Sequence, residues 1–273
     1  MRSPRSCCAA NGLFLSDQSR CAESLWTTTG YVHILVDVTF RDRLVATIRA
    51  AQPVLELPDV LVVGSEVPNL LEPDAAATLV VSLDLDVGVP VERHEEVKAR
   101  LAALTAFTPS PDEPSVLTPV ESHLLELNFV GIDLAQDPDK AYALADDRLP
   151  LMVFGPLSLV RPGREVDVEG VRVRVPRVAG LLLEKLVTDR TGDKGERDLL
   201  VALGLLTMVN AADIDELDTA YRALPAELRH AVRSNLTLLS LLEPRAGMPD
   251  PRPWRADVAT LLAALEGPGR SEP

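Results

Sequence analysis

The stretch Ser82-Leu83-Asp84-Leu85-Asp86-Val87 alternates polar with apolar side chains. In a β-strand, residues two apart point to the same face, so Ser82, Asp84 and Asp86 are expected side by side. Two neighbouring carboxylates repel each other unless a positive charge lies between them. A divalent cation supplies that charge, since Mg²⁺ (or Mn²⁺) takes carboxylate oxygens together with substrate phosphates. The alternative is a strand end at which both aspartates face water.

The pair Gly64-Ser65 follows a β-branched run at 60–63 that predicts a buried strand. Such a pair predicts a tight turn after the strand. The backbone N–H groups and the hydroxyl of this turn can approach phosphate oxygens without obstruction by a side chain. A Gly-Ser pair alone is usually only a turn, and its position ahead of the Asp84 strand is what makes it a candidate phosphate site.

Composition and charge limit the class of protein. The 273 residues are 47% hydrophobic and only 4% aromatic, which predicts a globular protein with an aliphatic core. A net charge of −14 argues against broad binding to nucleic acid or to an anionic membrane. No apolar run approaches the about 20 residues of a membrane span. The three cysteines, Cys7, Cys8 and Cys21, form no disulfide framework or zinc motif, so we expect a cytoplasmic protein.

Hydrophobic periodicity predicts an α/β (α+β) fold in two domains. A mixed sheet domain is expected at residues 31–176 and a helical domain at 177–273, after a disordered tail at 1–30. A short strand or helix entry is expected at 33–38, and strands are expected at 60–63, 78–87, 121–134, 157–160, 165–168 and 171–175. A helical turn is expected at 139–145 and a proline-rich loop at 109–114. Helices are expected at 40–51, 66–71, 94–106, 179–190, 196–209, 212–224, 226–242 and 256–265.

The Gly-Ser turn followed by Ser-x-Asp-x-Asp resembles the signature of the minimal nucleotidyltransferase superfamily. A later pattern is similar to that of uncharacterised bacterial nucleotidyltransferases and of abortive-infection toxins. It comprises Val171-Arg-Val-Arg-Val-Pro176, Leu183-Glu184-Lys185-Leu186, Arg190, Lys194 and Arg197-Asp198-Leu199. The resemblance covers residues 60–205, and the order of the motifs along the chain is more specific than any one of them.

This resemblance implies a nucleotidyltransferase-like sheet domain followed by a helical C-terminal domain. It also implies an enzyme that moves a nucleoside monophosphate from an NTP to a hydroxyl of RNA, a protein or a small molecule, with membranes excluded as partners. Asp84 and Asp86 would hold Mg²⁺ (or Mn²⁺), and Gly64, Ser65, Ser82 and Lys185 would bind the nucleotide. A toxin role, with an antitoxin as partner, would follow from the same resemblance.

The third carboxylate of the superfamily, in an apolar-Asp-Phe-Leu pattern, is replaced here by Asn128 in Leu127-Asn128-Phe129-Val130. Glu126, on the same strand face, is one substitute. Asp133 is another if Gly131 forms a β-bulge. The departure leaves two hypotheses, an active enzyme and a catalytically impaired binding or regulatory protein.

The basic and acidic residues of the later pattern also have a structural interpretation. Lys185 lies in an apolar helix. The alternative to a nucleotide-binding role is that its ammonium reaches bulk water at the helix boundary. Arg197 and Asp198 are equally compatible with ordinary ion pairing at a helix start.

Overall fold

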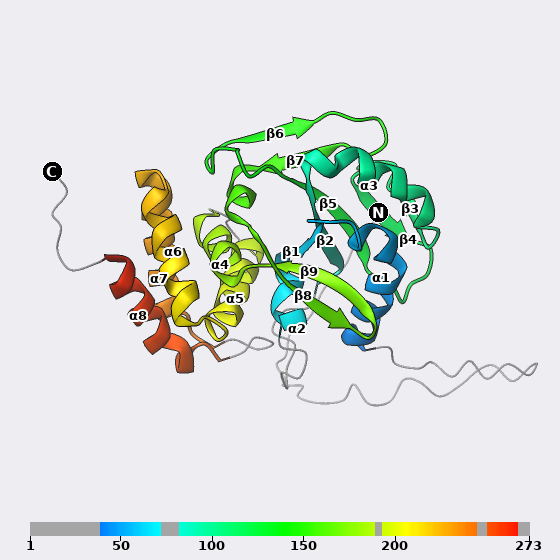
Figure 1. Cartoon of the computed structure of the whole chain (residues 1–273). Coiled ribbons are helices and arrows are strands. Elements are labelled where there is room, and N and C mark those ends of the chain that lie inside the picture. The colour runs from blue at the N-terminus through cyan, green and yellow to red at the C-terminus, as the bar shows by residue number, and fades with distance from the viewer. Residues whose placement is uncertain (1–38, 72–81, 189–192, 245–249, 267–273) are drawn as a thin grey trace, which may run out of the picture. The chain divides into compact units, whose positions relative to one another are not determined.

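Strands β2 (Asp84–Pro90) and β5 (Glu126–Ile132) run parallel at the centre of the sheet, in the computed structural model of the chain (Figure 1). The structure describes residues 39–71, 82–188, 193–244 and 250–266. The short strand or helix entry expected at 33–38, the start of the strand expected at 78–87, and the tail at 1–30 lie outside these residues. Strand β2 begins at Asp84, after Ser82 and Leu83, and continues beyond the predicted end to Pro90.

The sheet is mixed and has the order β1-β2-β5-β4-β3. Strand β1 (Leu61–Val63) is antiparallel to β2, and β4 (Val116–Pro119) is antiparallel to both β5 and β3 (Phe107–Pro109). Strand β7 (Leu151–Phe154) pairs in parallel with β5, and β6 (Ala141–Leu144) pairs with β7. The α/β fold class predicted from periodicity is therefore confirmed.

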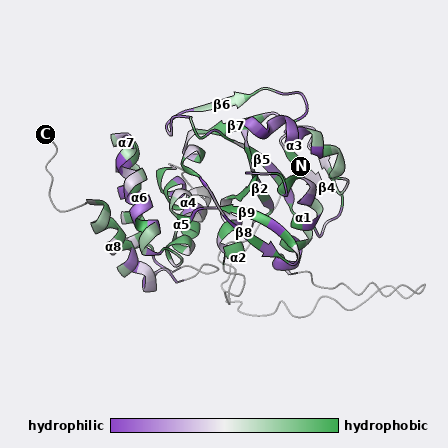
Figure 2. Cartoon of the chain, viewed as in Figure 1, coloured by the Kyte–Doolittle hydropathy of each residue, from purple (hydrophilic) through white to green (hydrophobic). Residues whose placement is uncertain are grey.

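One face of the central strands is apolar and forms the core. Leu85 and Val87 of β2 and Leu127 and Phe129 of β5 are buried there. Helices α1 (Phe40–Leu55) and α3 (His94–Arg100) contact β2. Figure 2 shows hydrophobic residues along β2 and β5 and a largely hydrophilic α3. The opposite face, which carries Asp84 and Asp86, is left free for polar side chains.

A separate hairpin packs beside this sheet. Strands β8 (Pro162–Val168) and β9 (Val171–Pro176) are antiparallel, and β9 contacts β1 and α1. Glu169 and Gly170 have φ angles of 49° and 91°, so the turn predicted at this pair is confirmed. Buried Val171, Val173 and Val175 alternate with polar side chains, as expected for a strand covered on one face.

The C-terminal part is helical, as predicted (Figure 1). Its helices are α4 (Val178–Val187), α5 (Asp193–Leu206), α6 (Ala211–Ala223), α7 (Ala226–Leu241) and α8 (Arg255–Glu266). Helix α4 is buried almost throughout because it contacts α5, α6 and α7. The described residues form one compact unit by their contacts, and the domain boundary expected after residue 176 stays a prediction. No described helix combines the length and the apolarity that crossing a membrane requires.

Two local predictions are wrong. Residues 139–145 contain strand β6 instead of a helical turn, because pairing with β7 overrides the helix propensity of Ala-Tyr-Ala-Leu. The proline-rich loop predicted at 109–114 is present, and it joins two strands that were not predicted, β3 and β4. The segment at 157–160 lies in the 3₁₀ turn Gly155–Leu159, and the strand precedes it as β7. The predicted 3.6-residue spacing at 66–71 and 94–106 is confirmed by shorter helices, α2 (Val67–Leu71) and α3.

Candidate active site

The register of β2 and β5 brings four polar side chains together on one sheet face. Asp84 lies opposite Glu126 and Asp86 lies opposite Asn128. The Asn128 amide donates from Nδ2 to Oδ1 of Asp86 at 2.7 Å. The Ser82 hydroxyl donates to Oδ1 of Asp84. Each aspartate is therefore held on one side by a neutral donor. The predicted same-face arrangement is present for Asp84 and Asp86, whereas Ser82 precedes the strand and reaches Asp84 through its hydroxyl.

The Gly64 turn lies against Asp86. In the antiparallel pair of β1 and β2, Val63 is opposite Asp86, and the chain then enters a 3₁₀ turn at Gly64–Glu66. Gly64 has a φ angle of 81°, which L side chains rarely adopt. A Cβ at this position would lie 2.1 Å from Oδ2 of Asp86. Both the backbone conformation and the contact with the carboxylate therefore require glycine.

These residues line a cleft of about 700 Å³. All eight residues predicted for the site lie in its wall: Gly64, Ser65, Ser82, Asp84, Asp86, Glu126, Asn128 and Lys185. The other described lining residues are Val63, Glu113, Ser115, Val116, Phe129, Val130, Met152, Phe154, Pro156, Leu157, Glu184, Thr188, Asp198 and Val201. The sheet contributes one wall and helices α4 and α5 contribute another.

Burial and like charge change the acidity of two carboxyl groups near the turn. Burial, and then the charge of Asp84, raises the pKa of Asp86 to about 6, although the Asn128 hydrogen bond and the Lys185 charge oppose the rise. Burial raises the pKa of Glu66 to about 7, against hydrogen bonds from Asn69 and Ser65. Burial and like charge therefore make the ionised forms of these two carboxyl groups costly, and a cation close to Asp86 would favour its ionised form.

Lys185 is held in the helical wall of the cleft by two carboxylates. Its Nζ lies 3.0 Å from Oε2 of Glu184 and 3.3 Å from Oδ1 of Asp198. The Lys185 side chain is only 7% exposed, so the alternative of an ammonium reaching bulk water is wrong. The ion pairing expected for Asp198 is confirmed, with Lys185 as its partner. This buried group of two acids and one base joins α4 to α5.

Two sets of sequence candidates do not join the site in the described structure. Asp133 follows the far end of β5, about 17 Å along the strand from Asn128. There it accepts hydrogen bonds from the Tyr142 hydroxyl and from the Ala135 backbone N–H. The unbroken register of β2 and β5 leaves no bulge at Gly131, so Asp133 is wrong as a third carboxylate. Arg190 and the side chains of Lys194 and Arg197 lie outside the described residues.

Sequence reasoning missed several residues of the cleft. Glu184 stood next to Lys185 in the quoted motif, but local spacing does not show that both side chains face one cavity. Glu113 lies in the segment predicted as a loop, and Ser115 directly follows it. Met152 and Phe154 carry no signal in the sequence, because Leu151-Met152-Val153-Phe154 is apolar throughout and its alternation of buried and exposed positions appears only in the structure.

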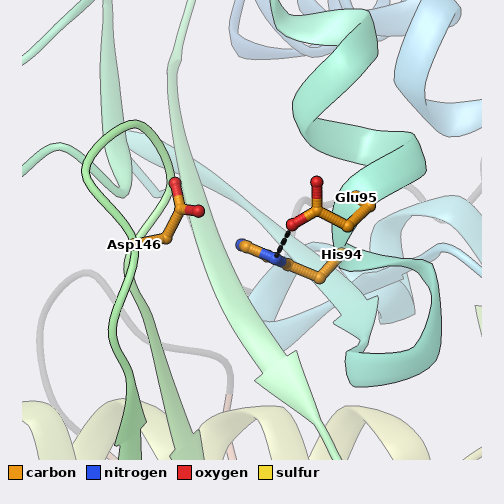
Figure 3. A group of neighbouring side chains, drawn as sticks. All are labelled: His94, Glu95 and Asp146. Atoms are coloured by element: carbon orange, nitrogen blue, oxygen red, sulfur yellow. Dashed lines mark ion pairs between the residues drawn. The ribbon is translucent and has the colours of Figure 1, made fainter.

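A different group of side chains has the spacing of a metal site among the described residues (Figure 3). Ligand atoms of His94, Glu95 and Asp146 lie within 4.8 Å of one another. The Lys98 ammonium, however, is 2.6 Å from Glu95 and 2.7 Å from Asp146, so it already supplies the positive charge. Nε2 of His94 lies 2.8 Å from the Leu149 carbonyl. We therefore interpret this group as a clamp between α3 and the segment after β6, outside the cleft.

The chain is similar in structure to nucleotidyltransferase-like proteins. One is an antigenic nucleotidyltransferase-like protein from Paracoccidioides brasiliensis, with 14% identity and a TM-score of 0.46 over 81% of this chain and 92% of that one. Another is the antibiotic-resistance factor ANT(2'')-Ia, with 15% identity and a TM-score of 0.40 over 68% and 95% of the two chains. A scan against protein families and a search of curated proteins gave no match. Because these similarities are low, the chemistry of the cleft has to be inferred from the side chains that line it.

Proposed function

We propose that this protein transfers a nucleoside monophosphate from an NTP to a hydroxyl acceptor, with a divalent cation at Asp84 and Asp86. The observation that supports this most directly is the carboxylate pair on one face of β2, set in a cleft beside the Gly64 turn. The acceptor oxygen forms a bond to the α-phosphorus while the bond to the departing pyrophosphate breaks.

The donor atoms at the centre of the cleft fit a hard divalent cation. Asp84 and Asp86 offer carboxylate oxygens, and the charge of Asp84 contributes to the raised pKa of Asp86. A cation between them removes this repulsion, and Mg²⁺ accepts such oxygen ligands. When bound, Mg²⁺ or Mn²⁺ supplies the positive charge that stabilises the phosphoryl group in transfer and the leaving pyrophosphate.

The other residues of the sheet wall position these carboxylates and the substrate. Hydrogen bonds from Ser82 and Asn128 orient Asp84 and Asp86. The glycine at the turn lets backbone N–H groups approach phosphate oxygens. Glu126 is exposed and lies opposite Asp84, so it is placed to accept the proton of the attacking hydroxyl.

Lys185 contributes charge to the same site. Its positive charge lowers the pKa of Asp86 and so offsets part of the repulsion between Asp86 and Asp84 in the cleft. Its ammonium is paired with Glu184 and Asp198, so direct contact with the triphosphate requires a phosphate oxygen to replace one of these carboxylates. We therefore propose that Lys185 binds the nucleotide when a phosphate oxygen replaces one of these two carboxylates as its partner.

The alternative function is a binding or regulatory protein that has lost turnover. Asn128 is the reason to consider it, because an amide at this position orients Asp86 without adding a negative charge to a cation site. This alternative predicts binding of an NTP with metal and no product. Restored transfer in Asn128→Asp would support it.

The charge of the cleft limits the acceptor. Its described lining residues include six carboxylates and a single basic side chain, Lys185. This balance favours a small molecule or a protein side chain over RNA, whose phosphates would be repelled.

A toxin role with an antitoxin partner rests on the motif resemblance. Growth arrest on expression of the wild type, but not of an Asp84→Asn, Asp86→Asn variant, would support that role.

The reaction can be tested with α-labelled NTPs in the presence of Mg²⁺ or Mn²⁺, offering RNA, protein and small-molecule hydroxyls as separate acceptors. Transfer of label is expected for the wild type and should be lost in Asp84→Asn and in Asp86→Asn. Asp133→Asn is the matched control, because this carboxylate lies outside the cleft. Label transfer that survives both cleft substitutions would rule out the proposed site.

A further inference from the structure

Strand β7 presents two large apolar side chains to the cleft. Met152 is 41% exposed and Phe154 is 44% exposed, whereas Leu151 and Val153, which alternate with them, are buried. Both exposed side chains line the same cavity as Asp84 and Asp86. Apolar side chains of this size that remain open inside a polar cavity indicate contact with an apolar part of a ligand.

The sheet register places these side chains on the face of the carboxylates. Gly131 of β5 lies opposite Val153, so both belong to the apolar core face. Residues one position away point to the other face, which puts Val130 and Met152 on the face of Asn128. The wall of the cleft therefore changes from acidic on β2, through an amide on β5, to apolar on β7.

The four strands also set an order across the cleft. The Gly64 turn follows β1, Asp86 lies on β2, Asn128 on β5 and Phe154 on β7. Strand β7 is also displaced along the strand direction, because Val153 lies opposite Gly131, three residues beyond Asn128. At about 4.8 Å between strands and about 3.3 Å per residue, Met152 lies about 8 Å from Asn128 and Phe154 about 14 Å. A nucleoside triphosphate has its parts in the same order, with phosphates, then sugar, then base.

We infer that Met152 and Phe154 form the site for the base of the nucleotide, an inference that rests on the proposed function. Phe154 supplies a π-face and Met152 a polarisable thioether, and both stack or pack on any of the four bases. Glu126 lies at the start of β5, at the end of this strand that is away from its pairing with β7. The apolar end of the cleft suits a base, and the acidic end suits a polar acceptor.

The inference is tested by calorimetric titration of the full chain with two kinds of ligand. One is Mg²⁺ with ATP, GTP, CTP or UTP, and the other is Mg²⁺ with tripolyphosphate, which has no base. Phe154→Ala is expected to weaken NTP binding by about 10-fold, the usual size of one base–aromatic contact, and to leave tripolyphosphate binding unchanged. Phe154→Trp should retain NTP binding.

Tyr142→Ala provides the matched control. Tyr142 is an exposed aromatic residue of β6, lies opposite Val153 and is not part of the cleft wall. NTP affinity unchanged in Phe154→Ala would overturn the assignment of the base site while leaving the proposed function intact. An equal loss of NTP and tripolyphosphate affinity in Phe154→Ala would also overturn it, because the effect would not involve the base. Failure of the wild type to bind either ligand would overturn the proposed function and this inference with it.

Discussion

Asn128 of β5 donates a hydrogen bond from Nδ2 to Oδ1 of Asp86, 2.7 Å away across the parallel pair at the centre of the sheet. The position that matches a third carboxylate by motif therefore holds a neutral residue that orients one aspartate. The side chain at residue 128 thus determines both the charge of the candidate cation site and the geometry of Asp86.

Asn128→Asp should separate these two effects. Without metal, a third carboxylate replaces the hydrogen bond with repulsion, and the free energy of unfolding should fall by about 1–3 kcal/mol. With Mn²⁺, the added ligand should raise metal affinity about 10-fold. Thermal unfolding and calorimetric titration with and without Mn²⁺ measure both. Asn128→Ala removes the hydrogen bond without adding charge and serves as control. Equal Mn²⁺ affinity in wild type and Asn128→Asp would contradict the assignment.

Gly64→Ala is expected to be more harmful than Gly170→Ala, although both glycines have positive φ angles, 81° and 91°. The backbone penalty of about 1–2 kcal/mol is common to both. A Cβ at Gly170 meets nothing within 4 Å, whereas one at Gly64 meets Asp86 Oδ2. We expect a further loss of about 1–3 kcal/mol and weaker Mn²⁺ binding for Gly64→Ala alone. Urea unfolding of the two variants checks this, and equal losses would show that the Asp86 contact is unimportant.

Glu66 should make stability depend on pH. Its pKa in the folded protein is about 7, above the ordinary value of 4.5, so the folded state binds this proton more tightly. The resulting stabilisation is complete below pH 4.5 and is lost as the pH rises through 7. Glu66→Gln, which cannot ionise, should therefore gain up to about 3 kcal/mol over the wild type at pH 8 and little at pH 4.5.

Urea unfolding at several pH values measures the difference between wild type and Glu66→Gln. Glu227→Gln, at an exposed position of α7, is the control and should follow the wild type throughout. A constant difference between wild type and Glu66→Gln from pH 4.5 to 8 would show that Glu66 does not titrate as described.

Lys185→Met should destabilise the protein by about 3–5 kcal/mol, because Glu184 and Asp198 would remain buried without their shared cation. Adding Glu184→Gln and Asp198→Asn should recover much of this loss, since the three residues then form an uncharged set. Chemical denaturation of the single and triple variants provides the comparison. A Lys185→Met variant as stable as the wild type would show that the ion pairs contribute nothing.

The sequence predicted the elements whose spacing is local and failed where pairing between distant segments decided the conformation. The period of 3.6 in α1 and the period of 2 in β9 are visible within a few residues, and both predictions were confirmed. Strand β6 has a helix-favouring sequence and is a strand only because β7 lies beside it. Edge strand β3 ends at Pro109, which read as loop from the sequence, since an edge position tolerates a missing N–H.

The alternation in residues 82–87 was sufficient by itself to put Asp84 and Asp86 on one face, because side chains in a strand alternate whatever surrounds them. It did not determine what lies opposite them. The parallel register with β5, set 42 residues along the chain, decided that Asn128 contacts Asp86. Only the tertiary structure placed Lys185 between Glu184 and Asp198 and opened Phe154 to the same cleft. These contacts depend on how distant segments pack, which the local periodicity of the chain does not record.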